Sequence, residues 1–179
     1  MEEKVKLFLG CGPFPIHPQH LEIVDDSWIF IDLYVRDPKI VRMDVKKLEY
    51  PDGSAEKIYC SHVLEHLAMK EINPTLKEWH RVLQPGGMLI VNVPDMEWAS
   101  GELVNQLHGI KPTSPVFDTP MKVMEIFYGN QDHEGEFHKC GFTLGILQVA
   151  LEDAGFHDIA IKEVYEAHEM GCLIARALA

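Results

Sequence analysis

Short apolar runs that end at glycine, serine or aspartate turns place the strongest constraint on the fold of this chain. The runs are nearly continuous in apolar residues, which is typical of strands buried on both faces of a parallel sheet. Segments with helical spacing of apolar residues follow several of them, and this alternation favours an α/β fold. The runs that we expect to be strands are Val5–Leu9, Trp28–Ile31, Ile40–Met43, Lys57–Cys60, Met88–Val93, Ile159–Val164 and Cys172–Ala177. The last two are expected to form an antiparallel hairpin that closes the sheet.

Three helices can be placed from their start and stop residues. Asn73-Pro74 predicts the start of the first, because Asn is a favoured N-cap and Pro a favoured first residue. Thr119-Pro120 predicts the start of a second helix. A third is expected from about 143 to 155, where glycine favours a left-handed C-cap. The segment 13–18 is too rich in proline for a regular helix, and 33–39 leaves no room for one.

The length of 179 residues indicates one domain, residues 1–179, since about 150 residues per domain is usual. Residues 101–141 contain three prolines and many polar residues. We expect this segment to be an insertion that covers the substrate at one end of the sheet, because loops at that position usually carry substrate contacts.

The chain is strongly acidic, with 16 Lys and Arg against 28 Asp and Glu and a net charge of −12. Such a surface repels phosphate backbones, so we expect no nucleic-acid partner. Four cysteines without a paired spacing favour reduced thiols in the cytoplasm over a disulfide framework. No apolar run is long enough to cross a membrane and no leader precedes the first strand, so we expect a cytoplasmic protein without a membrane partner.

A glycine pair and an acidic residue lie where two expected strands end. Gly10 and Gly12 follow the first run, and Asp32 follows the second, 20 residues after Gly12. This is the outline of a nucleotide-cofactor site, in which glycine lets the backbone approach the ligand and the carboxylate accepts ribose hydroxyls. Pro15 stands where the dinucleotide fingerprint has its third glycine, which weighs against NAD or FAD.

An ordered set of motifs extends this outline along nearly the whole chain. The motifs are Leu9-Gly10-Cys11-Gly12-Pro13, Asp32, Asp44, Ser61-His62-Val63-Leu64-Glu65-His66-Leu67, Arg81-Val82-Leu83-Gln84-Pro85-Gly86-Gly87 and His138-Lys139-Cys140-Gly141-Phe142. Together they resemble the class I S-adenosylmethionine-dependent methyltransferases, in particular the small bacterial "type 11" group. The resemblance implies S-adenosylmethionine as cofactor. It also implies a Rossmann-like, mostly parallel sheet of seven strands, with helices on both faces and the last strand antiparallel.

The resemblance also assigns cofactor contacts residue by residue. Gly10, Cys11 and Gly12 would hold the methionine part of the cofactor. Asp32 would hold the ribose and Asp44 the adenine amino group. The further contacts that it implies are Leu33 beside the adenine, Val45 next to Asp44, and Ser61 and His62 at the methionine and sulfonium. A turn or cap before Lys46 is the alternative role for Asp44. We expect loss of Asp32 to weaken cofactor binding and barely change stability, because a carboxylate at the sheet edge would face solvent.

Histidines near the methyl donor are candidates for a general base that deprotonates a hydroxyl acceptor. The candidates are His62, His66, His133 and His138, and of these we predict His62, His66 and His138 as catalytic residues. Glu65 and His66 match two positions that ligate a divalent metal in some related O-methyltransferases, but His62 stands where those enzymes have a glutamate. Glu is also favoured near the start of a helix, and on that interpretation no metal is expected.

These features favour an enzyme that transfers a methyl group from S-adenosylmethionine to a small-molecule or saccharide acceptor. In-line displacement at a sulfonium carbon mainly needs alignment of the reactants, so the absence of a strong nucleophile–base pair is no objection. Two alternatives stay open. A non-catalytic S-adenosylmethionine-binding or partner protein of the same fold would suit the short chain and its shortened helices. A nicotinamide-dependent oxidoreductase is less favoured because of Pro15.

Overall fold

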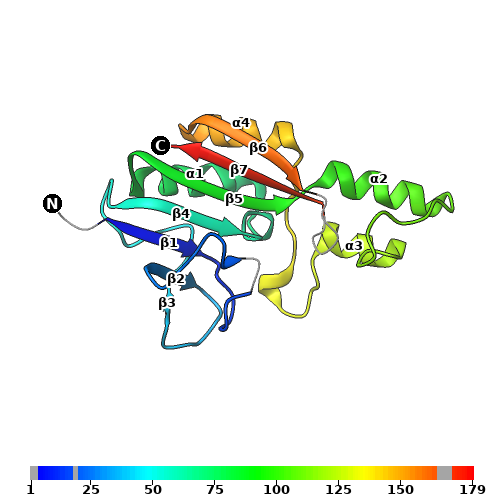
Figure 1. Ribbon diagram of the computed structural model, residues 1–179, viewed down its shortest axis with the longest axis horizontal. Helices are drawn as coiled ribbons and strands as arrows, with labels where there is room; N and C mark the ends of the chain where they lie inside the picture. The colour runs from blue at the N-terminus through cyan, green and yellow to red at the C-terminus, as the bar shows by residue number, and fades with distance from the viewer. Residues whose placement is uncertain (1–3, 18–19, 165–170) are drawn as a thin grey trace.

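The computed structural model describes residues 4–17, 20–164 and 171–179. In these residues the chain forms a seven-stranded sheet of order β3-β2-β1-β4-β5-β7-β6 (Figure 1). The strands are β1 (Val5–Leu9), β2 (Trp28–Asp32), β3 (Ile40–Arg42), β4 (Ala55–Ser61), β5 (Leu83–Pro94), β6 (His157–Val164) and β7 (Cys172–Leu178). Only β7 runs antiparallel to its neighbours, β5 and β6. The mostly parallel Rossmann-like sheet with an antiparallel last strand is therefore confirmed.

The strand order places a ligand-binding crevice at the carboxyl ends of β1 and β4. From β1 the chain continues to one side of the sheet as β2 and β3, and then returns to form β4 on the other side of β1. In open α/β sheets, ligands bind outside the carboxyl ends of the strands where the order reverses in this way. The Gly10–Gly12 loop and Asp32 both lie at this edge.

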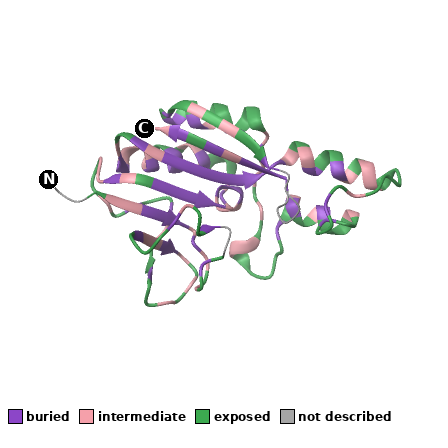
Figure 2. Cartoon of the chain, viewed as in Figure 1, coloured by how far each residue is buried: buried purple, intermediate pink, exposed green. Residues whose placement is uncertain are grey.

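Alternate side chains of the strands enter two different core clusters. Leu7 and Leu9 of β1 belong to the larger cluster, which includes the buried faces of α1 (Met69–Val82) and α4 (Leu144–Ala154). Phe8 points to the other face, where the apolar side chains come from the loop after β1 instead of from a helix. The expected helical layer is thus complete on one face, and the proline-rich segment replaces it on the other. Figure 2 shows the central strands almost entirely buried.

Two of the predicted helices begin and end as expected. In α3 (Pro120–Tyr128) the Thr119 side chain accepts a hydrogen bond from Lys122 N, and in α4 Thr143 accepts one from Ile146 N. Gly155 ends α4 in the left-handed conformation, with φ of 104°.

The predicted start of the first helix is wrong. Helix α1 begins at Met69, before the Asn73-Pro74 pair, so that Pro74 lies inside it. Glu71 stabilises the earlier start, because its Oε2 accepts a hydrogen bond from the Ala68 backbone at 3.0 Å. The earlier turn also buries Ile72 against the core, which offsets the backbone hydrogen bond that a proline cannot donate.

The segment between β5 and α4 contains a helix that the sequence did not reveal. Helix α2 (Met96–Leu107) begins directly after β5, and the Asp95 side chain caps it by accepting from Glu97 N at 2.9 Å. Helices α2 and α3 pack on each other beyond the end of the sheet, and the chain from 129 to 141 returns towards the carboxyl ends of the central strands (Figure 1). Only this returning part of the predicted insertion lies near the crevice.

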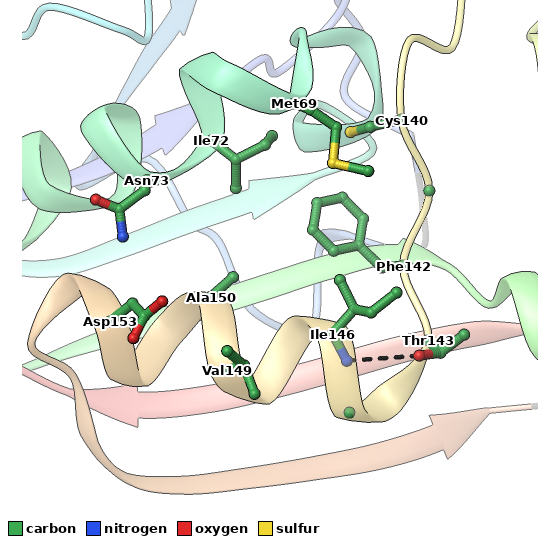
Figure 3. A pocket seen from close by; sticks show the side chains of 12 residues that line it. Met69, Ile72, Asn73, Cys140, Phe142, Thr143, Ile146, Val149, Ala150 and Asp153 are labelled. Carbon is green, nitrogen blue, oxygen red and sulfur yellow. Dashed lines mark hydrogen bonds between the residues drawn. The ribbon is translucent and has the colours of Figure 1, made fainter.

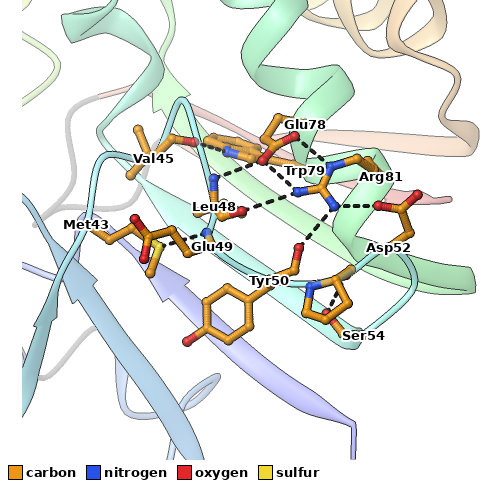
Figure 4. Close-up of polar contacts among 11 residues, drawn as sticks. Met43, Val45, Leu48, Glu49, Tyr50, Asp52, Ser54, Glu78, Trp79 and Arg81 are labelled. Carbon is orange, nitrogen blue, oxygen red and sulfur yellow. Dashed lines mark hydrogen bonds and ion pairs between the residues drawn. The ribbon is translucent and has the colours of Figure 1, made fainter.

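Arg81 fixes the connection between β3 and β4 to the end of α1 (Figure 4). Its guanidinium donates to the backbone carbonyls of Leu48 and Tyr50 and pairs with the carboxylates of Glu78 and Asp52. Nearby, the buried indole of Trp79 donates to Val45 O at 2.8 Å. These bonds hold the segment that begins with Asp44 and Val45, so the Arg81 motif positions part of the predicted cofactor site.

All four cysteines are free, as the sequence predicts. No helix in the described ranges is both long enough and apolar enough to cross a membrane.

Candidate functional site

A cavity of about 1200 Å³ opens at the carboxyl ends of β1, β2 and β4. All of the residues predicted to bind the cofactor line this cavity: Gly10, Cys11, Gly12, Asp32, Leu33, Asp44, Val45, Ser61 and His62. They come from four separate strand ends, and parallel pairing brings these ends to one edge of the sheet. That these residues bind the cofactor stays a prediction, but the fold does bring all of them together around one cavity.

Gly10 and Gly12, in the loop after β1, are required to be glycine for different structural reasons. Both have left-handed backbone, with φ of 66° at Gly10 and 67° at Gly12, which disfavours other residues. A Cβ atom on Gly10 would lie 2.1 Å from Cγ2 of Val63, so a side chain there does not fit. A Cβ on Gly12 would meet nothing within 4 Å, so the backbone at Gly12 is open to a ligand. Burial, followed by the charge of Asp32, raises the pKa of Cys11 to about 12, which keeps it a neutral thiol.

Asp32 connects the glycine loop to the loop after β2. Its Oδ2 accepts from Gly12 N at 3.1 Å, and its Oδ1 accepts from Tyr34 N at 2.8 Å and from Val35 N at 3.0 Å. The residue is 8 % exposed, so the expectation of a solvent-facing carboxylate is wrong. A carboxylate has about four acceptor positions, so these bonds leave about one for a ligand hydroxyl.

Asp44 stabilises a turn before Lys46, which is the alternative role that the sequence suggests for it. Its Oδ1 accepts from Lys46 N at 2.9 Å, and its Oδ2 lies 3.7 Å from Lys46 Nζ. The Lys46 ammonium also contacts Glu71 Oε1 at 3.1 Å, which ties the turn to α1. The turn places Asp44 and Val45 at the cavity, so the two roles of Asp44 are compatible.

The half-buried His62 pairs with the fully buried Glu65 beside the cavity. His62 has left-handed backbone with φ of 54°, which is uncommon for a non-glycine residue and typical of functional sites. Its Nδ1 lies 3.1 Å from Glu65 Oε1. Burial disfavours the charge on His62, but contacts with Cys172 and Glu65 outweigh it and raise the pKa of His62 to about 10. Burial likewise opposes ionisation of Glu65, but His62 lowers the pKa of Glu65 below its usual value.

The other two predicted catalytic histidines lie against each other, with ring centroids 4.8 Å apart. His66, at the end of a short 3-10 helix (Leu64–His66), lines the cavity, whereas His138 stands behind it. Burial lowers the pKa of His66, and the neighbouring His138 adds to this effect, although Glu65 opposes it. The structure therefore brings all three histidines into one cluster with Glu65, but only His62 and His66 reach the cavity.

Several cavity residues, among them Tyr34 and His20, were not predicted from the sequence, whereas His133 was one of the candidate bases. The rings of Tyr34 and His133 lie with their centroids 5.7 Å apart. His20 lines the cavity and shares a 2.9 Å hydrogen bond with the Tyr59 hydroxyl. These residues lie in irregular segments whose positions no periodicity predicts, although the high number of histidines, 10 in the chain, is a compositional indication.

A second, smaller cavity of about 590 Å³ lies between α1 and α4 (Figure 3). Its lining is mainly apolar, with Met69, Ile146 and Val149 among the side chains. Among its polar residues, Figure 3 shows Asn73 and Asp153 towards one end and Thr143 towards the other. Because binding sites combine apolar walls with a few convergent polar groups, the larger cavity is the better candidate.

Comparisons with known proteins agree with this geometry. A family model described as a methyltransferase domain matches residues 24–91, which span β2 to most of β5. Solved structures of similar fold include an S-adenosylmethionine-dependent methyltransferase from Methanosarcina mazei, with 21 % identity, a TM-score of 0.64 and coverage of 99 % of this chain and 93 % of that one. The chain therefore has the fold of S-adenosylmethionine-dependent methyltransferases, and its residues 24–91 match a methyltransferase domain.

Two further solved structures are similar to this chain. One is an S-adenosylmethionine-dependent methyltransferase from Archaeoglobus fulgidus, with 14 % identity, a TM-score of 0.64 and coverage of 98 % of this chain and 86 % of that one. The other is the 1,6-didemethyltoxoflavin-N1-methyltransferase of Burkholderia thailandensis, with 17 % identity, a TM-score of 0.65 and coverage of 97 % and 70 %. No curated protein sequence matches this chain.

The residues of the large cavity fit S-adenosylmethionine, the cofactor of the methyltransferases that share this fold. The open backbone at Gly12 admits a ligand, and Asp32 keeps an acceptor position for a ribose hydroxyl. Leu33 and Val45 give apolar wall to the part of the cavity predicted to hold the adenine. The local chemistry of the cavity thus agrees with the fold and with the match to a methyltransferase domain.

Proposed function

We propose that this protein transfers the methyl group of S-adenosylmethionine to a small-molecule or saccharide acceptor. The size of the cavity is the observation that carries the proposal. Ligand pockets usually measure about 300 to 1,000 Å³. The cavity measures about 1200 Å³ and continues past the predicted cofactor residues to His133, Glu136 and Lys139. It therefore has room for a small second ligand beside the cofactor.

Charge favours a neutral or cationic acceptor. Four carboxylates and two lysines line the cavity, and the chain has a net charge of −12. A polyanion such as a nucleic acid would meet repulsion both at the surface and at the opening. The similar structure from Burkholderia thailandensis acts on a small molecule, which supports the same class of acceptor here.

The chain's own residues would act mainly by orientation. Bound S-adenosylmethionine supplies an electrophilic methyl group, and aligning a nucleophile with it provides much of the rate acceleration. His62 has both ring nitrogens engaged, Nδ1 with Glu65 and Nε2 with Cys172 Sγ at 3.9 Å, so it would act by holding a fixed, positively charged ring at the cavity wall. His66 presents an unprotonated ring nitrogen at the cavity wall when its Nδ1 donates to the Phe137 carbonyl. His138 would position His66 through their ring contact.

We also infer that residues 1–179 act as one domain in the cytoplasm. Four free cysteines, three of them buried, suit a reducing compartment.

The test uses S-adenosylmethionine labelled in its methyl group. The protein is incubated with a cell extract, and label is measured separately in small molecules, saccharides, nucleic acids and proteins. We expect label in the first two fractions, and excess S-adenosylhomocysteine should abolish it by competition. Label confined to nucleic acid or protein would contradict the acceptor class. If S-adenosylhomocysteine raises the melting temperature but no fraction becomes labelled, the non-catalytic alternative is correct.

A further inference from the structure

Glu65 has one carboxylate oxygen that the site described above does not use. The side chain is 0 % exposed, and Oε1 contacts His62 Nδ1 at 3.1 Å. Its Oε2 is buried and has no hydrogen-bond partner in the described part of the chain. A buried, unpartnered carboxylate oxygen is costly. This atom therefore requires a proton donor or a cation.

His66 and His138 cannot supply that donor when their rings are neutral. His66 Nδ1 lies 3.2 Å from Phe137 O, and His138 Nδ1 lies 2.7 Å from Ile126 O. A carbonyl oxygen only accepts, so Nδ1 carries the proton in both rings and Nε2 carries a lone pair. The cluster thus brings together a carboxylate oxygen and two imidazole lone pairs, with no donor between them.

The three side chains are close enough to share one ion. Each offers a ligand atom, and these atoms all lie within 4.8 Å of one another. Two ligands bound at about 2.1 Å in tetrahedral geometry are roughly 3.4 Å apart, so a shift of about 1.4 Å or less completes the arrangement. The Nδ1 bonds to Phe137 O and Ile126 O fix the ring orientation, as outer-shell carbonyls do for metal-bound histidines.

We propose that Glu65, His66 and His138 bind a divalent first-row transition metal at the acceptor end of the cavity. Two imidazoles and one carboxylate favour zinc, iron or a similar ion over magnesium or calcium, which prefer oxygen ligands alone. This proposal replaces the expectation from the sequence that no metal is bound. The segment that returns from α3 brings His138 to the Glu65-His66 pair, which supplies the third ligand.

Three protein ligands leave coordination positions open, and His66 lines the cavity, so these positions face the acceptor space. An oxygen atom of the acceptor, such as a hydroxyl, would complete the coordination. This consequence rests on the proposed function, whereas metal binding rests on the cluster alone. The metal would then bind Nε2 of His66, the ring nitrogen that otherwise faces the cavity.

The test is titration of the chelator-treated protein with Co²⁺ and with Zn²⁺, followed by calorimetry and by the visible absorption of Co²⁺. We expect one ion per chain and a cobalt spectrum with nitrogen and oxygen ligands. In His66→Asn and His138→Asn, the amide can still donate to the carbonyl that Nδ1 contacts, but Nε2 is lost. These variants and Glu65→Gln should each weaken binding at least about 100-fold. The control is His157→Asn, which changes an exposed histidine on β6 and should bind as the wild type does.

Absence of saturable binding at one ion per chain, or unchanged affinity in the three variants, would overturn the proposal. If a variant does not fold by circular dichroism, the cobalt spectrum of the wild-type protein decides, because a spectrum without imidazole ligands overturns the proposal alone. Methyl transfer measured on the same samples separates the two proposals. Metal binding without transfer contradicts the function only, and transfer that survives chelation without any metal binding contradicts the metal site only.

Discussion

Replacing Asp32 tests both the fold and the cofactor assignment. In Asp32→Ala, the backbone N–H groups of Gly12, Tyr34 and Val35 lose a charged acceptor. A hydrogen bond to a charged group contributes about 1.5 to 3 kcal/mol. The three bonds share one carboxylate, and water can replace part of them at these half-buried positions. We therefore expect a loss of about 3 kcal/mol in the free energy of unfolding, well below the sum of the three.

Asp32→Asn separates stability from cofactor binding. The amide keeps one oxygen, which can still accept from part of the loop, so we expect a loss of about 1.5 kcal/mol in stability. Its NH₂ group cannot accept a ribose hydroxyl, so affinity for S-adenosylhomocysteine should fall at least tenfold. Asp37→Ala is the matched control, because Asp37 also accepts a backbone N–H, from Lys39 at 2.8 Å, but this hydrogen bond is exposed to solvent.

The assays are urea unfolding and calorimetric titration with S-adenosylhomocysteine. We expect Asp37→Ala to change stability by less than about 0.5 kcal/mol, as is usual at exposed positions. If Asp32→Ala is as stable as Asp37→Ala, the bridge between the two loops does not stabilise the fold. If the Asn variant binds the ligand as the wild type does, Asp32 does not hold the ribose, and the non-catalytic alternative gains support.

Two further predictions concern glycine geometry and pH. Gly129 and Gly109 have nearly equal φ values, 74° and 75°, but a Cβ would lie 1.7 Å from Glu136 O at Gly129 and meet nothing within 4 Å at Gly109. Gly129→Ala should therefore lose about 2 kcal/mol more stability in urea unfolding than Gly109→Ala, and equal losses would contradict the close packing of 129 on 136. Burial, and then His17 and His62, lower the pKa of His20 from 6.5 to about 4, so the unfolded chain binds the proton first as pH falls below 6.5. Stability should fall by about 2 kcal/mol more between pH 7 and pH 5 in the wild type than in His20→Asn, and parallel pH profiles would contradict a neutral buried ring.

Local sequence patterns predicted much of the fold and the outline of the site. The strand runs, the Thr119 and Thr143 caps and Gly155 depend on interactions within a few residues, so they can be read without the tertiary structure. The start of α1 could not be read in this way. Burial of Ile72 in the core and the Glu71 side chain outweigh the start signal at Asn73-Pro74. Helix α2 was missed because its cap, Asp95, also ends the preceding strand.

The sequence by itself determined that the predicted cofactor residues reach the cavity. Gly12, Asp32 and Asp44 follow strands of a parallel sheet, and the carboxyl ends of such strands meet at one edge whatever the details of packing. The tertiary structure alone decided what those residues contact there. In the folded chain the Asp32 carboxylate accepts hydrogen bonds from backbone N–H groups of two loops. The fold also places His138, from the far end of the insertion, close to Glu65. Contacts of this kind join segments distant in sequence, and they are set by how the elements pack, which no local pattern records.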